Sequence, residues 1–140
     1  MNARFFLDTN IFVYSFGENS TAKARQASKL VRTAVETGKG VVSYQVVQEF
    51  LNVAMKRFAS PMSAPEAAQY VTAILRPLWT VHSSPALFGE ALRICDEHRL
   101  AWYDSLIVSA ALESECEILY SEDLQHGRRF GSLQIQNPFQ

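Results

Sequence analysis

The sequence predicts an α/β fold with a mostly parallel central sheet, and two observations support this prediction. Short apolar runs rich in strand-forming residues alternate with longer segments of helical periodicity along the 140 residues. Hydrophobic residues make up 48% of the chain and charged residues 19%, a mixture that excludes disordered and low-complexity proteins. No internal repeat, charge block or Pro/Gly-rich linker divides the sequence, so we expect residues 1–140 to form one domain.

The first half of the chain contains two expected strands and two expected helices. The first apolar run ends at Asp8, and the apolar residues Ile11–Tyr14 that follow are expected to form a turn. Gly38 gives the first helix a stop signal, and Ser43 is placed to cap the second. The expected order is strand Arg4–Leu7, helix Thr21–Thr37, strand Val41–Val42 and a helix from Ser43 to about Arg57.

The second half adds three helices and three strands. Ser63 can cap a helix that ends before Pro77, because the residue before a proline disfavours the helical conformation. Pro85 suits the first position of the next helix, which Ser84 precedes. The expected order is helix Ser63–Arg76, strand Leu78–Val81, helix Ser84–His98, helix Asp104–Ser114, strand Glu117–Tyr120 and strand Leu133–Ile135.

The charge of the chain is nearly balanced overall but unevenly distributed. The net charge of −1 excludes a strongly basic protein that coats nucleic acid, although it allows local binding. Seven Lys and Arg residues against two acids lie within 23–57, whereas nine acids against two arginines lie within 90–123. Such a chain can offer a cation-attracting site together with a phosphate-attracting surface, but solvated helix faces of different charge would give the same counts.

The sequence predicts a cytoplasmic protein whose two cysteines, Cys95 and Cys116, are reduced. The apolar patch Phe5–Leu7 is cut off by Asp8, far short of the apolar region of a secretory signal. No window reaches the roughly 18 uncharged apolar residues that a membrane span requires, so we expect no membrane association.

Two carboxylates lie at or shortly after the ends of expected strands, where ligands of parallel sheets bind. A buried carboxylate at Asp8 needs a hydrogen bond, a cation or a metal, and it could equally cap the apolar turn. Asp123 follows the strand Glu117–Tyr120 beside Glu122, which could be the functional acid instead. We prefer Asp123 because it shares a side of extended backbone with Ser121, although an Asx-type turn would also explain it.

Two further acids lie on expected helices. Glu49 falls at the edge of the apolar stripe of its helix, where it can lean over the strand ends or simply reach solvent. Asp104 begins a helix that is apolar on nearly all sides, and it lies on a face expected to point inward. A favourable interaction with the helix dipole would also explain an acid at this position.

The four acids taken together predict a site for a divalent cation. Carboxylates brought into one place repel one another unless a cation neutralises them. An all-oxygen set suits Mg²⁺ or Mn²⁺, whereas the scattered histidines and the absence of a CxxC motif argue against zinc. We therefore expect one shared, negatively lined hollow formed by Asp8, Glu49, Asp104 and Asp123.

In their order and spacing these residues resemble the PIN-domain nucleases, and especially the toxin ribonucleases of VapC type. The resemblance spans nearly the whole chain and rests on the segments Phe6–Ile11, Ser43–Asn52, Trp102–Ile107 and Leu119–Leu124. The family's four catalytic, metal-binding acids correspond to Asp8, Glu49, Asp104 and Asp123. Asn10 and Ser121 match the family's polar residues near the first and last acids, and they would orient carboxylates and waters.

The resemblance implies a three-layer α/β/α sandwich and an endonuclease that uses Mg²⁺ or Mn²⁺ to hydrolyse RNA. Asp8, Asp104 and Asp123 would hold a hydrated cation and so activate a water for attack on the phosphodiester. Glu49 would hold a second ion or accept a proton from that water.

The same resemblance implies a homodimer and a small antitoxin protein that inhibits the nuclease. Aromatic residues would serve a dimer interface or, more commonly, the core, and they include Phe58, Tyr70, Trp79 and Trp102. Phosphate contacts would come from residues 23–57 or from Arg128 and Arg129, and they would position the RNA without reading its sequence.

Other functions of acidic α/β domains fit less well. A haloacid-dehalogenase-type phosphatase needs a second aspartate where this chain has Asn10. A phospho-receiver domain needs a lysine after its last strand, whereas no lysine follows Lys56. The serious alternative is a catalytically silent module that keeps the fold and binds RNA or a protein, and the intact acids argue against it.

Overall fold

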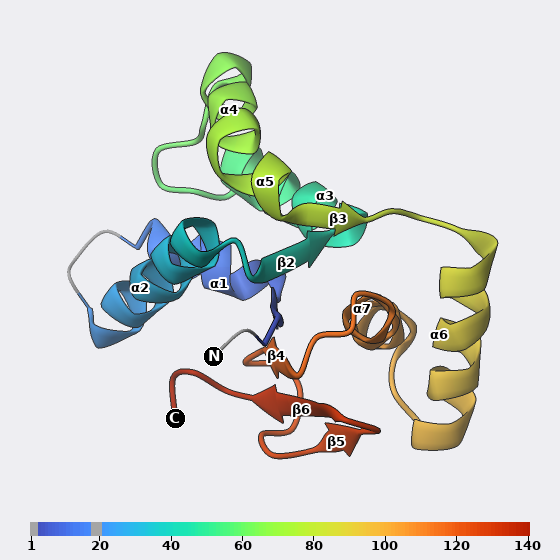
Figure 1. Ribbon diagram of the computed structural model, residues 1–140. Coiled ribbons are helices and arrows are strands. Elements are labelled where there is room, and N and C mark those ends of the chain that lie inside the picture. The colour runs from blue at the N-terminus through green and yellow to red at the C-terminus, as the bar shows by residue number, and fades with distance from the viewer. Residues whose placement is uncertain (1–2, 18–20) are drawn as a thin grey trace.

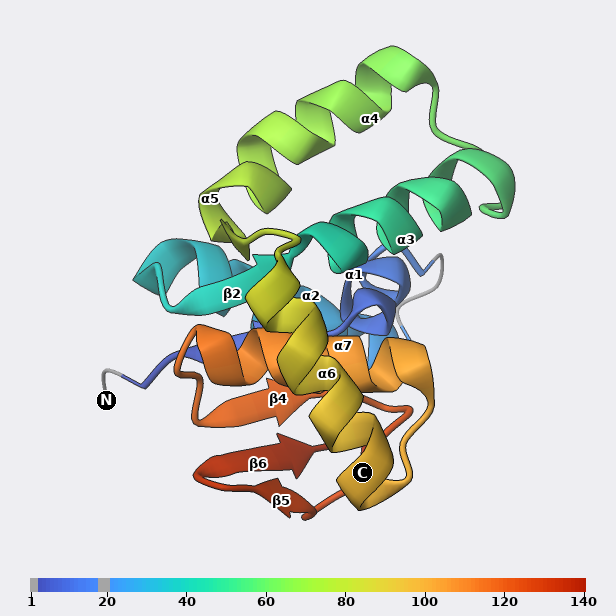
Figure 2. The same cartoon turned by 90° about the vertical axis from the view of Figure 1, so that its right-hand side faces the viewer.

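The structure, a computed structural model, describes residues 3–17 and 21–140, and their strands form a six-stranded sheet. The strands lie in the order β3-β2-β1-β4-β6-β5, and Figure 2 shows β4, β6 and β5 following one another below α7. Neighbouring strands are parallel except for the antiparallel pair β5 and β6, so the predicted mostly parallel sheet is confirmed. The strands are β1 (Phe5–Leu7), β2 (Gly40–Ser43), β3 (Trp79–Val81), β4 (Ile118–Tyr120), β5 (Arg129–Phe130) and β6 (Leu133–Gln136).

Helices cover both faces of the sheet and give three layers (Figure 1). Helices α1 and α2 lie on one face, and α7 lies on the other with α6 outside it. The described helices are α1 (Thr9–Ser15), α2 (Ala22–Thr37), α3 (Tyr44–Lys56), α4 (Ala64–Tyr70), the π-helix η1 (Val71–Leu75), α5 (Arg76–Leu78), α6 (Pro85–His98) and α7 (Trp102–Glu113). None of them combines the length and the apolar character that crossing a membrane requires.

The core lies between these layers and fixes the central strand β1. Phe6 and Leu7 are fully buried, and because successive side chains of a strand alternate, they pack on opposite faces of the sheet. Helix α7 is buried at every residue from 105 to 111, as the apolar pattern of its sequence predicts. On the other face α2 approaches β2 so closely that a Cβ on Gly40 would lie 2.2 Å from the Cβ of Ala34.

Several helix ends follow local signals in the sequence. The side chains of Thr21 and Ser84 each accept a backbone N–H at 3.0 Å in the first turn of α2 and α6. Ser63 and Glu66 form a reciprocal capping box at the start of α4. Gly38 ends α2 with a φ of +69°, a conformation that glycine adopts readily.

The predicted end of the helix after Ser63 is wrong. Helical structure continues through Pro77 to Leu78, so β3 begins at Trp79. The chain passes first through the π-helix η1, where the N–H of Arg76 bonds the carbonyl of Val71, five residues earlier. A proline lacks an N–H and crowds the preceding turn, and the wider π turn accommodates both effects.

Other local differences are smaller. Residues Ile11–Tyr14 belong to the helix α1 rather than to a turn, and α7 begins at Trp102, so Asp104 lies in its first turn. The two-residue strand β5 was not predicted. Ser43 precedes α3, but its side chain makes no capping bond, and its hydroxyl is buried without a partner in the described part of the chain. Ser43 is the last residue of β2, so the sheet rather than the helix sets its position.

Candidate functional site

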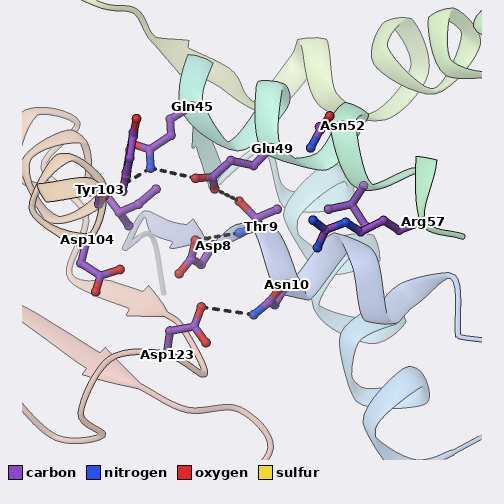
Figure 3. Close-up of a pocket in the computed structure, with 12 residues that line it drawn as sticks. Asp8, Thr9, Asn10, Gln45, Glu49, Asn52, Arg57, Tyr103, Asp104 and Asp123 are labelled. Atoms are coloured by element: carbon purple, nitrogen blue, oxygen red, sulfur yellow. Dashed lines mark hydrogen bonds between the residues drawn. The ribbon is translucent and has the colours of Figure 1, made fainter. Parts of the chain in front are cut away.

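The four acids predicted to share a site line one hollow of about 290 Å³ (Figure 3). Asp8 directly follows β1 and Asp123 lies in the loop after β4, and these two strands are parallel neighbours. Carboxyl ends of parallel strands meet at one edge of a sheet, which brings the two side chains together. Glu49 reaches the hollow from α3, and Asp104 reaches it from the first turn of α7.

Asp8 is the most deeply buried of these acids, with 8% of its surface exposed. Its Oδ1 accepts the backbone N–H of Thr9 at 2.8 Å, and its Oδ2 accepts the hydroxyl of Ser121 at 2.8 Å. Asp8 thus caps α1 while it lines the hollow. Burial raises the pKa of Asp8 to about 6, and the nearby carboxylates of Glu49 and Asp123 add to the rise.

Asp123 is held by the two polar residues that were expected to orient carboxylates. The side-chain amide of Asn10 donates to Oδ2 of Asp123 at 3.2 Å. The hydroxyl of Ser121 accepts the backbone N–H of Asp123 at 3.2 Å while it donates to Asp8, so Ser121 contacts both acids. Burial, followed by repulsion from nearby carboxylates, raises the pKa of Asp123.

Glu122, the neighbouring acid that the sequence left as an alternative, is engaged elsewhere. Its carboxylate accepts hydrogen bonds from the ammonium of Lys23 and the hydroxyl of Tyr14. These hydrogen bonds lower the pKa of Glu122. The structure therefore places Asp123, and not Glu122, on the wall of the hollow.

Two side chains that the sequence analysis missed hold Glu49. The hydroxyl of Thr9 donates to its Oε1 at 2.5 Å, and the amide of Gln45 donates to its Oε2 at 3.1 Å. The same amide donates to the backbone carbonyl of Tyr103 at 3.2 Å, so the buried Gln45 links α3 to the helix that carries Asp104. Gln45 precedes Glu49 by four residues, and this helical spacing was the available signal.

Asp104 is half-buried and presents a carboxylate that other side chains leave open. Burial, followed by repulsion from Asp123 and Glu49, raises the pKa of Asp104. Across residues 3–17 and 21–140, no hydrogen bond or ion pair occupies its side chain, in contrast to Asp8. Asp104 is thus positioned to accept an external ligand.

The donor chemistry of the hollow fits a hard divalent cation. The ion pairs among the described residues involve none of its four acids, so no lysine or arginine neutralises them. Carboxylate oxygens with uncompensated charge are ligands that Mg²⁺ and Mn²⁺ prefer. Within the described residues, however, no three acidic, His or Cys side chains are gathered closely enough to hold an ion. The acids share a hollow but not a ready-made metal cluster.

The basic residues expected to contact phosphate occupy different surroundings. Lys23 pairs with Glu122, and the guanidinium of Arg128 donates to the carbonyl of His98 at 3.1 Å. Arg57, within the predicted basic region, instead lines the hollow together with Asn52 and Tyr103. No sequence signal singled out these three residues, because their positions depend on how α3 and α7 approach each other.

We expect Gln45→Leu to lower the free energy of unfolding by about 1–3 kcal/mol, because it removes a buried donor from two acceptors. Gln48→Leu on the exposed side of the same helix is the matched control, and its effect should stay within about 0.5 kcal/mol. Urea unfolding followed by circular dichroism measures both. Equal stability of the Gln45 variant and the parent would contradict the linking role of Gln45.

Comparison with known proteins gives a match to a family model and to solved structures. The model of a family described as PIN domain matches residues 5–129 of the chain. No curated protein sequence matches this chain. Among solved structures, a toxin–antitoxin complex from Klebsiella pneumoniae is similar with a TM-score of 0.68 and 16% identity, covering 95% of this chain and 96% of the other.

Two further solved structures share the fold with similar TM-scores and sequence identities. The Mycobacterium tuberculosis toxin VapC20, described as cleaving the sarcin–ricin loop, has a TM-score of 0.63 and 18% identity over 85% of this chain and 89% of its own. VapBC2 from Rickettsia felis, bound to a DNA fragment from its promoter, has a TM-score of 0.60 and 18% identity over 95% of this chain and 97% of its own. At sequence identities this low, the similarity of these structures to the chain shows a shared fold.

Proposed function

The chain belongs to the PIN-domain family, and from this premise we propose that it is a Mg²⁺- or Mn²⁺-dependent endoribonuclease that hydrolyses phosphodiester bonds. The observation that carries the proposal is the hollow itself, which Asp8, Glu49, Asp104 and Asp123 line without an ion pair among the described residues. Four carboxylates of this kind attract a dication and repel a bare phosphate. An activity on RNA therefore requires that metal neutralise the acids first.

The residues of the hollow divide into ligands and residues that position them. Asp8, Asp104 and Asp123 would hold the cation, and Glu49 would hold a second one or accept a proton. When bound, the cation supplies an activated water and offsets negative charge on the phosphate. Ser121 fixes the carboxylate of Asp8 through its hydroxyl, as Asn10 does for Asp123, so neither acid is free to rotate away.

The proposal includes a biological setting in the cytoplasm, as the toxin of a toxin–antitoxin pair. Structures of toxin–antitoxin complexes with the same fold support a small antitoxin partner, and the resemblance to VapC-type toxins supports a homodimer. Sedimentation of the purified chain at micromolar concentration tests the dimer, and a monomer would contradict it. Co-expression with the product of an adjacent short reading frame tests the antitoxin.

We expect the purified chain to cut RNA with Mg²⁺ or Mn²⁺ and to stop cutting when EDTA removes the metal. The reason is that the uncompensated acids cannot hold a phosphodiester without a cation. Gel analysis of a labelled RNA pool, with metal restored after EDTA as the control, measures this. RNA binding without cleavage under every metal condition would instead favour a catalytically silent module.

A further inference from the structure

Arg57 places an unpaired positive charge on one wall of the hollow. It follows the last residue of α3 and is exposed to solvent. Among the described residues the ion pairs involve Lys23, Arg93 and His98, so no carboxylate neutralises the guanidinium of Arg57. Arg57 also lines a second hollow of about 460 Å³, which therefore adjoins the first. A cation between two adjoining hollows can hold the backbone of a polyanion that extends from one into the other.

Tyr103 places an exposed aromatic ring on the opposite wall, and Asp8 and Glu49 lie between Tyr103 and Arg57 (Figure 3). Its surface is 67% exposed, although it is a large side chain at the start of the mostly buried α7. Its backbone carbonyl is fixed by the amide of Gln45 at 3.2 Å, so the ring is open to solvent on an anchored backbone. An exposed aromatic ring beside a phosphate site offers a face on which a nucleobase can stack.

We propose that a single-stranded segment of RNA crosses the hollow between these walls, with Arg57 binding a backbone phosphate and Tyr103 stacking on an unpaired base. This inference rests on the proposed function and adds to it the form of the substrate. A base inside a duplex is already stacked on its neighbours, so its face is not available to Tyr103. Arg57 offsets the repulsion between the RNA and the acids but reads no sequence.

The test measures binding separately from cleavage. A labelled, randomised single-stranded RNA of about 12 nucleotides is titrated with the full chain, with Ca²⁺ in place of Mg²⁺ so that a dication offsets the charge of the acids. Fluorescence anisotropy is followed from about 50 to 200 mM salt, and gel analysis of the same samples checks that the probe stays intact. Tyr103→Ala should weaken binding by about 10-fold, whereas Tyr103→Phe keeps the ring and should stay within about twofold of the parent. A blunt RNA duplex should bind the parent and Tyr103→Ala equally.

Substitution of Arg57 should change the salt dependence of RNA binding. Arg57→Gln should weaken binding at low salt and reduce the slope of log affinity against log salt by about 0.7, the value for one phosphate contact on a single strand. Arg57→Lys should retain that slope. Two controls remove similar groups from exposed positions that do not line the hollow: Arg76→Gln removes a charge and Leu92→Ala an apolar side chain. Neither control should change binding.

The outcomes distinguish this inference from the proposed function. If the parent cuts RNA with metal but binds the probe equally well after Tyr103→Ala and Arg57→Gln, the inference is wrong and the nuclease stands. If binding depends on both residues but no cleavage occurs with any metal, the inference stands and the nuclease is wrong. Equal losses in the control variants, or no binding of the probe by the parent, would also overturn the inference.

Discussion

Asp8→Asn is expected to abolish RNA cleavage and, at the same time, to stabilise the metal-free protein. Asp8 is 8% exposed, and burial raises the pKa of its carboxyl group from 3.8 to about 6. At neutral pH the folded protein must keep this group ionised in a place that disfavours the charge. Asparagine has the same shape and can still accept the N–H of Thr9 through its carbonyl oxygen. It lacks the negative charge with which a carboxylate attracts and neutralises a dication.

The difference in stability between the parent and Asp8→Asn changes with pH in a definite direction. Because the pKa of Asp8 is higher in the folded state, the folded protein binds the proton more tightly than the unfolded chain. The stability of the parent relative to Asp8→Asn therefore falls as pH rises from about 4 to about 6, and the full difference is present above that range. From these pKa values the difference at pH 7 is up to about 3 kcal/mol.

Chemical denaturation in EDTA at neutral and acidic pH measures the difference. Asp96→Asn, an exposed aspartate on α6, is the matched control and should change neither stability nor cleavage. A variant at Asp8 that is less stable than the parent at pH 7 would show that the hydrogen bond from Ser121 outweighs the burial of charge. Cleavage by Asp8→Asn at the rate of the parent would remove Asp8 from the catalytic set.

Asp123→Asn should reduce cleavage by about 100-fold or more, because Asp123 would hold the cation directly and even residues that only orient metal ligands contribute about 10- to 100-fold. Glu122→Gln, one residue earlier, should leave cleavage nearly unchanged. The two acids differ in surroundings and not in chemistry: Asp123 lines the hollow, whereas Glu122 is bonded to Lys23 and Tyr14. A partly exposed ion pair of this kind contributes little to stability, so the fold should persist in both variants.

Initial rates at saturating Mg²⁺ measure the two variants, and circular dichroism checks their folding. Because the variants change neighbouring residues in the same loop, a general disturbance of that loop would affect both. A loss of cleavage in Glu122→Gln that equals the loss in Asp123→Asn would therefore contradict the assignment of Asp123. If Asp123→Asn cleaves RNA at the rate of the parent, whatever Glu122→Gln does, the assignment of Asp123 is also wrong.

Elements set by local chemistry were predictable. Gly38 ends α2, Ser63 begins α4, and the apolar sequence of α7 is buried as its pattern indicates. Pro77 predicts a helix end, because the residue before a proline disfavours the helical conformation. The π turn at Val71–Leu75 that accommodates Pro77 depends on a longer stretch of chain. The capping bond expected from Ser43 is absent because the sheet positions that residue.

The α/β class and the positions of Asp8 and Asp123 after two strands follow from the sequence, because strand periodicity and the positions of strand ends are local properties. Only the packed structure shows that Asp123 rather than Glu122 lines the hollow, and that Gln45 and Thr9 contact Glu49. Hydrogen-bond partners far apart in the chain depend on how helices dock on the sheet. That docking is a property of the packed core and not of any short segment.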